Sequence, residues 1–165
     1  MRAVVAGLGL ALAVASGAAA ATTKIGSWTV EETSDAFTDV GAGIAWVDAS
    51  AGRLAIKCDR PGKNSVYVLV SPDHSLGFFG TTIEYRTTLL RFDQGTTISQ
   101  QWNYYQDHGY SDRGAPARAI TERARDAKQL KVRLLDFEEA PTDLIFDVSG
   151  AADAIAMVRQ WCGDV

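Results

Sequence analysis

The sequence predicts an α+β fold: an antiparallel β-sheet or sandwich of about seven to eight strands, two helices in the C-terminal third, and one disulfide. Three observations lead to this prediction. Short β-like segments follow one another from residue 27 to residue 105, two segments with helical periodicity lie after residue 115, and the chain contains two cysteines. Because the early strands are not each followed by a helix, their order favours an antiparallel sheet over repeated βαβ units.

The first half contains six segments that alternate apolar and polar residues or are rich in β-branched and aromatic residues, as strands are. They cover residues 27–32, 43–48, 52–59, 65–70, 78–92 and 96–104, and the segment 78–92 is long enough for two strands. Within 65–70, three valines alternate with Tyr67 and Leu69. We therefore expect this strand to be central in the sheet or covered by a helix.

The pattern of the last third of the chain predicts a helix, two strands and a second helix. Pro116 suits the first turn of a helix over 117–128, and strands follow at 130–137 and 143–148. Ser149 is predicted to cap the last helix, 150–162, and Gly163 to end it. All four prolines of the chain lie between predicted elements, which supports the boundaries.

The N-terminus resembles an export signal. A positive start at Met1-Arg2 precedes an apolar stretch over residues 3–15, and Ala18-x-Ala20 fits a peptidase site with cleavage before Ala21. The alternative is a retained membrane anchor, but the stretch is short and mostly alanine. The sequence thus predicts a signal peptide over 1–20, one periplasmic domain over 21–165, and no membrane span after signal removal.

The two cysteines, Cys58 and Cys162, are predicted to form a disulfide. In an oxidising compartment, an even pair in one domain usually pairs. Cys58 falls on the apolar face of its strand and Cys162 on the apolar stripe of the last helix. A reactive thiol is the alternative, but Cys162 lies at a helix C-terminus, where the helix dipole does not lower the pKa of a thiol.

Charge and motifs exclude several functions. The chain has 16 Lys and Arg against 20 Asp and Glu, a formal net charge of −4, without the basic patch that nucleic-acid binding needs. It contains no Gly-x-Ser-x-Gly motif and no phosphate-binding or dinucleotide-binding glycine loop. Its two histidines, His74 and His108, leave few centres for acid–base or metal chemistry. We therefore predict no cofactor, no metal and no catalytic residue.

The stretch from Trp102 to Asp112 has the composition of a binding loop. Aromatic rings beside amides and carboxylates suit a sugar or a partner protein. The candidate binding residues are Trp102, Tyr104, Tyr105, Asp107, His108 and Tyr110.

Two other interpretations of this stretch stay open. Trp102 and Tyr104 stand two residues apart, so both could instead belong to the core face of one strand. Asp107, His108 and Asp112 could meet at a metal, although their spacing fits no EF-hand or zinc pattern.

A series of short motifs follows the predicted signal peptide. In chain order they are Gly26-Ser27-Trp28-Thr29-Val30, Leu54-Ala55-Ile56-Lys57-Cys58-Asp59, Tyr85-Arg86, Arg91-Phe92-Asp93, Trp102, Leu130-Lys131-Val132-Arg133, Phe146-Asp147-Val148-Ser149-Gly150, Ala154-Ile155 and Cys162. This order resembles the periplasmic accessory proteins of type VI secretion systems, the VasI or TagO type. Proteins of the invasion-associated locus B type share the closing strand, Ser-Gly and helix and are a weaker match.

This resemblance implies a fold, a periplasmic location and the lack of a known enzymatic activity. It also implies that Cys58 and Cys162 form a structural bridge and that Arg91, Asp93 and Trp102 are architectural. An Arg91–Asp93 pair could in addition hold a partner surface in place. No catalytic residue is carried over.

Together these observations predict a non-enzymatic periplasmic binding or accessory protein of a bacterial envelope. Its partner would be an envelope protein or a cell-wall component, and the resemblance adds an association with type VI secretion. One alternative is a small hydrolase acting on peptidoglycan or peptide, with His108 as base and Asp107 or Asp112 as its partner. A second alternative is a structural or inhibitor-like module.

Overall fold

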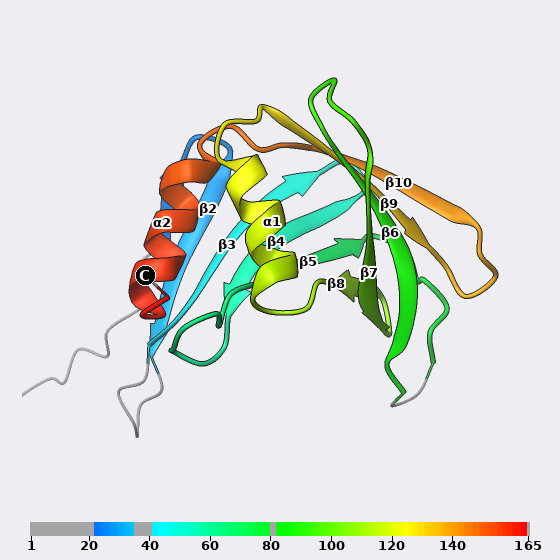
Figure 1. The fold of residues 1–165 in the computed structure, drawn as a ribbon, viewed down its shortest axis with the longest axis horizontal. Coiled ribbons are helices and arrows are strands. Elements are labelled where there is room, and N and C mark those ends of the chain that lie inside the picture. The colour runs from blue at the N-terminus through cyan, green and yellow to red at the C-terminus, as the bar shows by residue number, and fades with distance from the viewer. Residues whose placement is uncertain (1–21, 35–40, 80–81, 165) are drawn as a thin grey trace, which may run out of the picture.

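The structure is a computed structural model that describes residues 22–34, 41–79 and 82–164. The predicted signal peptide lies outside the described residues. Within them, the chain forms ten strands and two helices (Figure 1). In chain order these are β1 (Thr22–Ile25), β2 (Trp28–Ser34), β3 (Gly41–Ala49), β4 (Gly52–Cys58), β5 (Tyr67–Pro72), β6 (Glu84–Phe92), β7 (Ile98–Tyr105), β8 (His108–Tyr110), α1 (Ala115–Ala124), β9 (Gln129–Leu135), β10 (Pro141–Asp147) and α2 (Ala151–Trp161).

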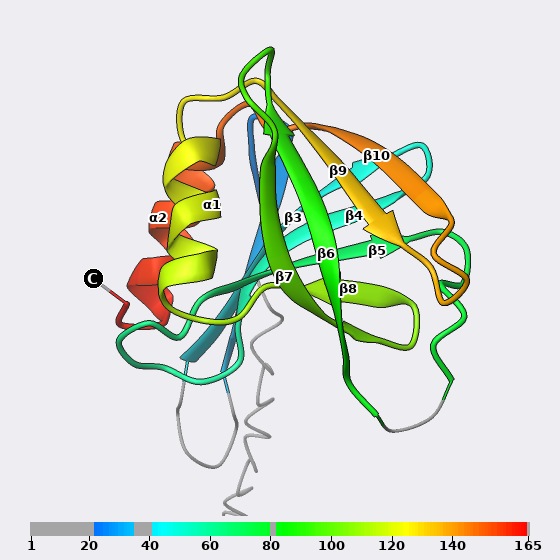
Figure 2. The same ribbon diagram turned by 45° about the vertical axis from the view of Figure 1, so that its right-hand side comes forward.

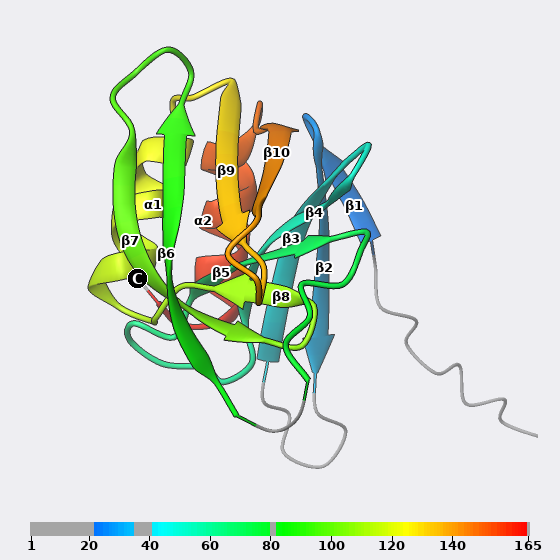
Figure 3. The same cartoon turned by 90° about the vertical axis from the view of Figure 1, so that its right-hand side faces the viewer.

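The strands form one antiparallel sheet with the order β1-β2-β3-β4-β5-β8-β7-β6-β9-β10. The first five strands pair with their neighbours in sequence. The chain then crosses to β6 and returns through β7 to β8, which pairs with β5. The sheet curves strongly, so that β10 packs close to β3 (Figures 1 and 3).

The predicted α+β class with seven to eight strands is wrong. The fold is mostly one antiparallel sheet, with 49% of residues in strands and 16% in helices. The sequence pattern misses β1 and β8, because strands of three or four residues are too short to show a periodicity. The prediction also left a sheet and a sandwich open, whereas β6 pairs directly with β9 and joins the strands before and after α1 in one sheet.

The two helices lie side by side on one face of the curved sheet (Figure 2). We call this the inner face and the opposite one the outer face. Helix α1 buries Ala117, Ile120 and Ala124, and it ends at Ala124, before the predicted end at residue 128. Helix α2 packs on β2, β3 and β4. The helices therefore cover the inner face and leave the outer face of the sheet accessible.

The start of α2 differs from the prediction. Gly150, in the left-handed conformation, precedes the helix, and no side chain caps it. The carbonyl of Ser149 instead accepts a hydrogen bond from the Ser27 amide at 3.0 Å. A Cβ on Gly26 or Gly150 would collide with the backbone of the opposite segment. Close packing of two backbones therefore decides this helix start and requires glycine on both sides.

The core lies between the inner face and the helices. Trp28, Trp102, Tyr104 and Phe146 are fully buried there. The Trp28 Nε1 donates to the Val148 carbonyl at 3.2 Å, across 120 residues of sequence. This bond attaches the second strand to the segment that leads into α2, so both ends of the chain are anchored in one core.

The structure confirms the disulfide between Cys58 and Cys162. Their Cα atoms lie 6.4 Å apart, and the bridge joins the end of β4 to the end of α2. The Cys162 carbonyl also accepts a hydrogen bond from the Gly62 amide at 2.7 Å. The last helix is thus fixed to the sheet at its C-terminal end.

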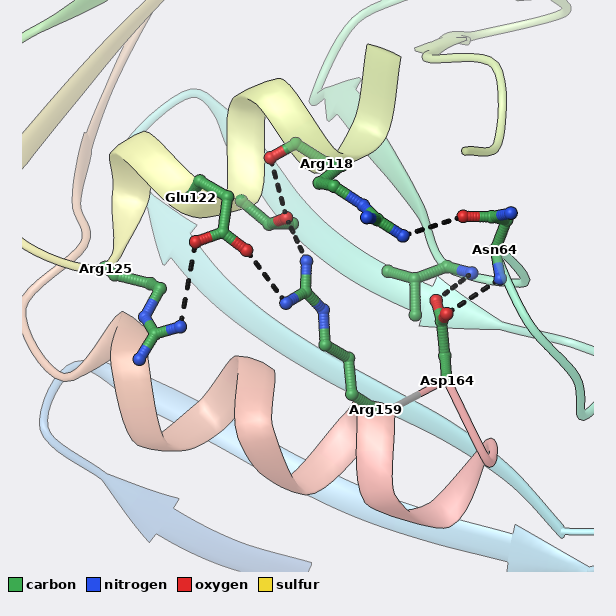
Figure 4. A network of polar contacts seen from close by, with 8 residues as sticks. Asn64, Arg118, Glu122, Arg125, Arg159 and Asp164 are labelled. Atoms are coloured by element: carbon green, nitrogen blue, oxygen red, sulfur yellow. Dashed lines mark hydrogen bonds and ion pairs between the residues drawn. The ribbon is translucent and has the colours of Figure 1, made fainter. Parts of the chain in front are cut away.

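Polar contacts connect the helices to each other and to the loop after β4 (Figure 4). Arg159 of α2 donates to the Glu122 carboxylate of α1 at 2.9 Å, and Arg118 of α1 donates to the Asn64 side chain at 2.8 Å. The Asp164 carboxylate accepts a hydrogen bond from the Asn64 amide at 2.7 Å. The described C-terminal residues therefore reinforce the same region that the disulfide connects.

We expect replacement of both cysteines by alanine to lower the free energy of unfolding by about 4–5 kcal/mol. The bridge closes a loop with a sequence separation of 104 residues, and the chain-entropy model gives this magnitude for a loop of that length. Denaturant unfolding of the oxidised wild type and of the Cys58→Ala, Cys162→Ala variant measures the difference.

A reductant serves as the control. It should lower the unfolding midpoint of the wild type and leave that of the double variant unchanged. A double variant as stable as the oxidised wild type would show that the bridge does not stabilise the fold.

Candidate functional site

The predicted binding loop is a β-hairpin in the structure. Strands β7 and β8 are joined by a tight turn, in which Gln106 adopts a positive φ of 52°. Successive side chains of a strand point to opposite faces. Trp102 and Tyr104 point to the inner face and are fully buried, whereas Tyr105, His108 and Tyr110 lie on the outer face. Only the second group can contact a ligand.

Strand β5 supplies the other side of the site. Its valines Val68 and Val70 are buried in the core, which leaves Tyr67 and Leu69 on the outer face, where they line the site. Leu69 pairs with Tyr110, and Tyr67 lies one pleat further along the same face. Residues about forty positions apart in sequence are thereby placed side by side.

These strands line a pocket of about 420 Å³ on the outer face. A pocket of this size is within the usual range for small-ligand sites. Its wall is mostly aromatic and apolar, with charged side chains at one end. The lining residues are Asp59, Tyr67, Leu69, Ile83, Tyr105, His108, Tyr110, Ser111, Asp112 and Arg113.

Four rings form a continuous row along the pocket. The ring centres of Tyr105 and His108 are 5.8 Å apart, those of His108 and Tyr110 are 5.9 Å apart, and those of Tyr110 and Tyr67 are 6.2 Å apart. Tyr105–His108 and Tyr110–Tyr67 meet edge to face, and all three separations are favourable for aromatic pairs. Each ring thus supports its neighbour, which pre-organises the pocket.

Arg113 closes one end of the row. Its guanidinium carbon lies 4.8 Å from the Tyr67 ring centre, and its Nε donates to the Ser65 carbonyl at 3.2 Å. Its Nη2 is 3.4 Å from the Asp59 Oδ2. This oxygen also accepts a hydrogen bond from the Tyr67 hydroxyl at 2.7 Å. Burial, and then the bond to Asp59, raise the pKa of the Tyr67 phenol, so this group stays protonated.

The hairpin is tied to β5 through residues just after β8. The Ser111 amide donates to the Val68 carbonyl at 2.8 Å, and the Val68 amide donates to the Ser111 Oγ at 3.0 Å. The Asp112 carboxylate accepts a hydrogen bond from the buried Asn103 side chain at 2.7 Å. These contacts hold the charged end of the pocket to the sheet.

His108 is partly buried in the middle of the ring row. Burial lowers the pKa of His108 from its ordinary value of 6.5, Lys57 lowers it further, and the Asp107 charge opposes the shift. The imidazole is therefore neutral at neutral pH and offers one donor and one acceptor.

The structure does not bring the predicted acid–base or metal partners together. Asp107 accepts a hydrogen bond from the Ser75 hydroxyl at 2.7 Å, and Asp112 is bonded to Asn103. Over residues 22–34, 41–79 and 82–164, no cluster of three His, Cys, Asp or Glu side chains could hold a metal ion. His108 thus lacks a bound carboxylate that would orient it as a base.

Arg91 and Asp93 lie away from the pocket, at the turn between β6 and β7. Arg91 donates to the Gly95 carbonyl at 3.0 Å, and the Asp93 carboxylate accepts the backbone amides of Lys128 and Gln129 at 3.1 and 2.9 Å. Arg91 thus bonds within its own turn, whereas Asp93 attaches this turn to the start of β9.

Sequence reasoning missed the half of the pocket that comes from outside the hairpin. Tyr67, Asp59 and Arg113 belong to other segments, and Ile83 precedes β6. The one available signal was the alternation of apolar residues around Tyr67. It indicated that both faces of this strand are apolar, but not which residues lie beside them. In the part of the chain that the structure describes, neither helix is long and apolar enough to cross a membrane.

Comparison with known proteins gives one likeness in fold. No protein-family model matches the chain, and no curated protein matches it. The structure is similar to the crystal structure of invasion associated protein B from Bartonella henselae, with a TM-score of 0.56 and 12% sequence identity over 85% of this chain and 96% of that chain. The resemblance to the invasion-associated locus B type therefore extends to the fold, whereas none of these comparisons supports the type VI secretion family.

Proposed function

We propose that this chain is an exported, non-enzymatic binding protein of a bacterial envelope, and that its outer-face pocket holds an envelope protein or a cell-wall component. The row of Tyr105, His108, Tyr110 and Tyr67 carries the proposal. Aromatic side chains in a concave site supply large contact areas and hydrogen bonds at a low entropic cost, which is why they dominate binding hot spots.

The surface around the pocket favours a ligand larger than the pocket itself. Ile83 is 46% exposed at the rim, and Tyr85 is 68% exposed on the adjacent strand. Tyr85 and Tyr110 pair with the same residue, Asn103, from opposite sides. Exposed apolar side chains that continue a pocket are typical of interaction sites.

The arrangement around His108 favours binding over hydrolysis. A general base needs a hydrogen-bonded partner that orients it and stabilises its protonated form. Among the described residues, no hydrogen bond joins His108 to Asp107 or Asp112, since each of these carboxylates is bonded elsewhere.

Two observations support export. A disulfide between residues distant in sequence is typical of proteins that fold in an oxidising compartment, and the first 20 residues have the composition of a signal peptide. An association with type VI secretion depends on the sequence resemblance alone and stays a prediction.

We expect the double substitution Tyr105→Ala, Tyr110→Ala to abolish capture of the envelope ligand. It removes two of the four rings of the row and leaves the buried face of β7 unchanged. Cross-linking of a tagged protein in its native cells, followed by identification of the recovered molecules, compares wild type and variant.

The matched control is Phe137→Ala, Ile145→Ala, which removes two exposed apolar side chains outside the pocket. This control should recover the same molecules as the wild type. If the tyrosine variant also recovered every one of them, the pocket would not be the binding site.

We further expect ligand binding to weaken in acidic solution, below pH 6.5. The pKa of His108 in the free protein lies below 6.5, so the imidazole is neutral at pH 7 and gains a proton only in more acidic solution. A ligand that covers the ring removes more water from it and favours the neutral form. Binding then requires loss of a proton at low pH, and affinity should fall by at most about tenfold per pH unit.

Affinity measured from pH 8 to pH 5 for wild type and His108→Gln tests this dependence. The affinity of the wild type should be constant above pH 7 and fall in acidic solution. The affinity of His108→Gln should not show this fall. Parallel profiles of the two proteins would show that His108 does not contact the ligand.

A further inference from the structure

The charged groups at one end of the pocket, together with Lys57, balance one another. Asp59 lies 3.4 Å from both the Lys57 ammonium and the Arg113 guanidinium, and it accepts a hydrogen bond from the Tyr67 hydroxyl. Asp112 forms no ion pair with a described residue, and one of its oxygens accepts a hydrogen bond from the Asn103 side-chain amide. Two carboxylates and two cations leave this end of the pocket without a net charge.

The remaining polar groups of the pocket are neutral. Burial raises the pKa of Tyr110 above its ordinary value of 10 and lowers the pKa of His108 below 6.5. Phenol hydroxyls and an unprotonated imidazole both donate and accept hydrogen bonds. At neutral pH the ring row therefore presents aromatic edges and faces together with uncharged donors and acceptors.

A charged ligand would fit this pocket poorly. A cation would be attracted to ring faces, but the guanidinium of Arg113 already covers Tyr67. An anion would meet Asp59 and Asp112, and to bind Arg113 it would have to displace Asp59. Either ion would also lose its hydration at an end of the pocket whose charges sum to zero.

An uncharged sugar has the complementary chemistry. One side of a pyranose ring is made of C–H groups, which are attracted to the negative face of an aromatic ring, and its rim carries hydroxyls that donate and accept hydrogen bonds. Carboxylates held in place by Asn103 and Lys57 suit such hydroxyls, since each keeps an acceptor lone pair. The rings would contact the apolar side of the sugar and the charged end would bind its hydroxyls.

The length of the aromatic surface indicates more than one sugar ring. Tyr85 and Tyr110 face outward on either side of Asn103, two strand spacings apart, which corresponds to about 10 Å. Tyr85 is 68% exposed and lies outside the pocket proper. It provides a second platform beyond the ring row.

We infer that the ligand of the outer-face pocket is an uncharged oligosaccharide, bound with one ring on the Tyr105–His108–Tyr110–Tyr67 row and a further ring on Tyr85. This inference rests on the proposed binding function and specifies the class of its ligand. Charged polymers are the ligands that it excludes.

Isothermal titration calorimetry with the purified, oxidised protein tests the inference. The uncharged probes are the tetrasaccharides of N-acetylglucosamine, cellulose and maltose, with the matching disaccharides. The charged probes are tetragalacturonate, a tetralysine peptide and a tetraglutamate peptide. We expect at least one uncharged tetrasaccharide to bind and the charged probes not to bind.

Three variants locate the binding. Tyr110→Ala should weaken binding of the tetrasaccharide by about tenfold or more, as expected for the central ring of a binding site. Tyr85→Ala should weaken the tetrasaccharide but not the disaccharide, and its exposed position makes loss of folding no concern. Ile145→Ala, an exposed residue on β10, is the matched control and should bind like the wild type. Thermal unfolding of each variant verifies its fold.

The outcomes separate this inference from the proposed function. Binding of a charged probe that depends on Tyr110 would overturn the sugar inference and keep the pocket as a binding site. If no uncharged sugar bound at millimolar concentration, the inference would be wrong, even if cross-linking still depended on Tyr105 and Tyr110. Sugar binding that Tyr110→Ala leaves unchanged would overturn it as well.

Discussion

Two residue pairs between β5 and β8 hold the two halves of the sheet together. Leu69 pairs with Tyr110 and Val70 with Gly109, and the bonds between Ser111 and Val68 extend this short connection. Without it, strands β1 to β5 and strands β6 to β10 would be separate sheets with exposed edges. The aromatic pocket lies on this connection, because Tyr110 and Tyr67 face outward from its two sides. The same pairing that completes the sheet therefore creates the site.

The inner face explains why the outer face can carry function. Helix α2 is fixed at its start by the backbone contact of Gly26 with Ser149 and Gly150, and at its end by the disulfide to β4. Trp28 adds a buried hydrogen bond to the same region. Because the core lies only on the inner face of the sheet, the aromatic residues on the outer face are not needed for core packing. They are supported by a rigid sheet, as precise binding sites usually are.

Binding and catalysis make different demands on a histidine, and the surroundings of His108 favour binding. Burial among rings keeps its imidazole neutral, while the nearby carboxylates are bonded to Ser75 and Asn103. At the end of the pocket, Asp59 pairs with Lys57 and Arg113, so that with Asp112 the charges there sum to zero. A site whose charges are internally satisfied is suited to neutral ligands, since it gains little from a free ion.

The sequence alone was sufficient for the features that depend on residue type and local spacing. Two cysteines on apolar faces predicted the disulfide that the structure confirms, and the cluster from Trp102 to Tyr110 predicted where aromatic side chains gather. The alternation around Tyr67 correctly indicated a central strand with apolar side chains on both faces. Each of these signals is contained within a few neighbouring residues.

The tertiary structure decided the number of strands, their assembly in a single sheet and the residues that line the pocket. A shift of one residue in the strand pairing sends every side chain of a strand to the other face. The hairpin turn at Gln106 and the pairing with β5 therefore determine the direction of the side chains. They place Tyr105, His108 and Tyr110 on the outer face and Trp102 and Tyr104 on the inner face. Pairings such as β5 with β8 and β6 with β9 join segments about forty residues apart. Local periodicity carries no information on such partners, because the energy that selects them comes from packing across the whole core.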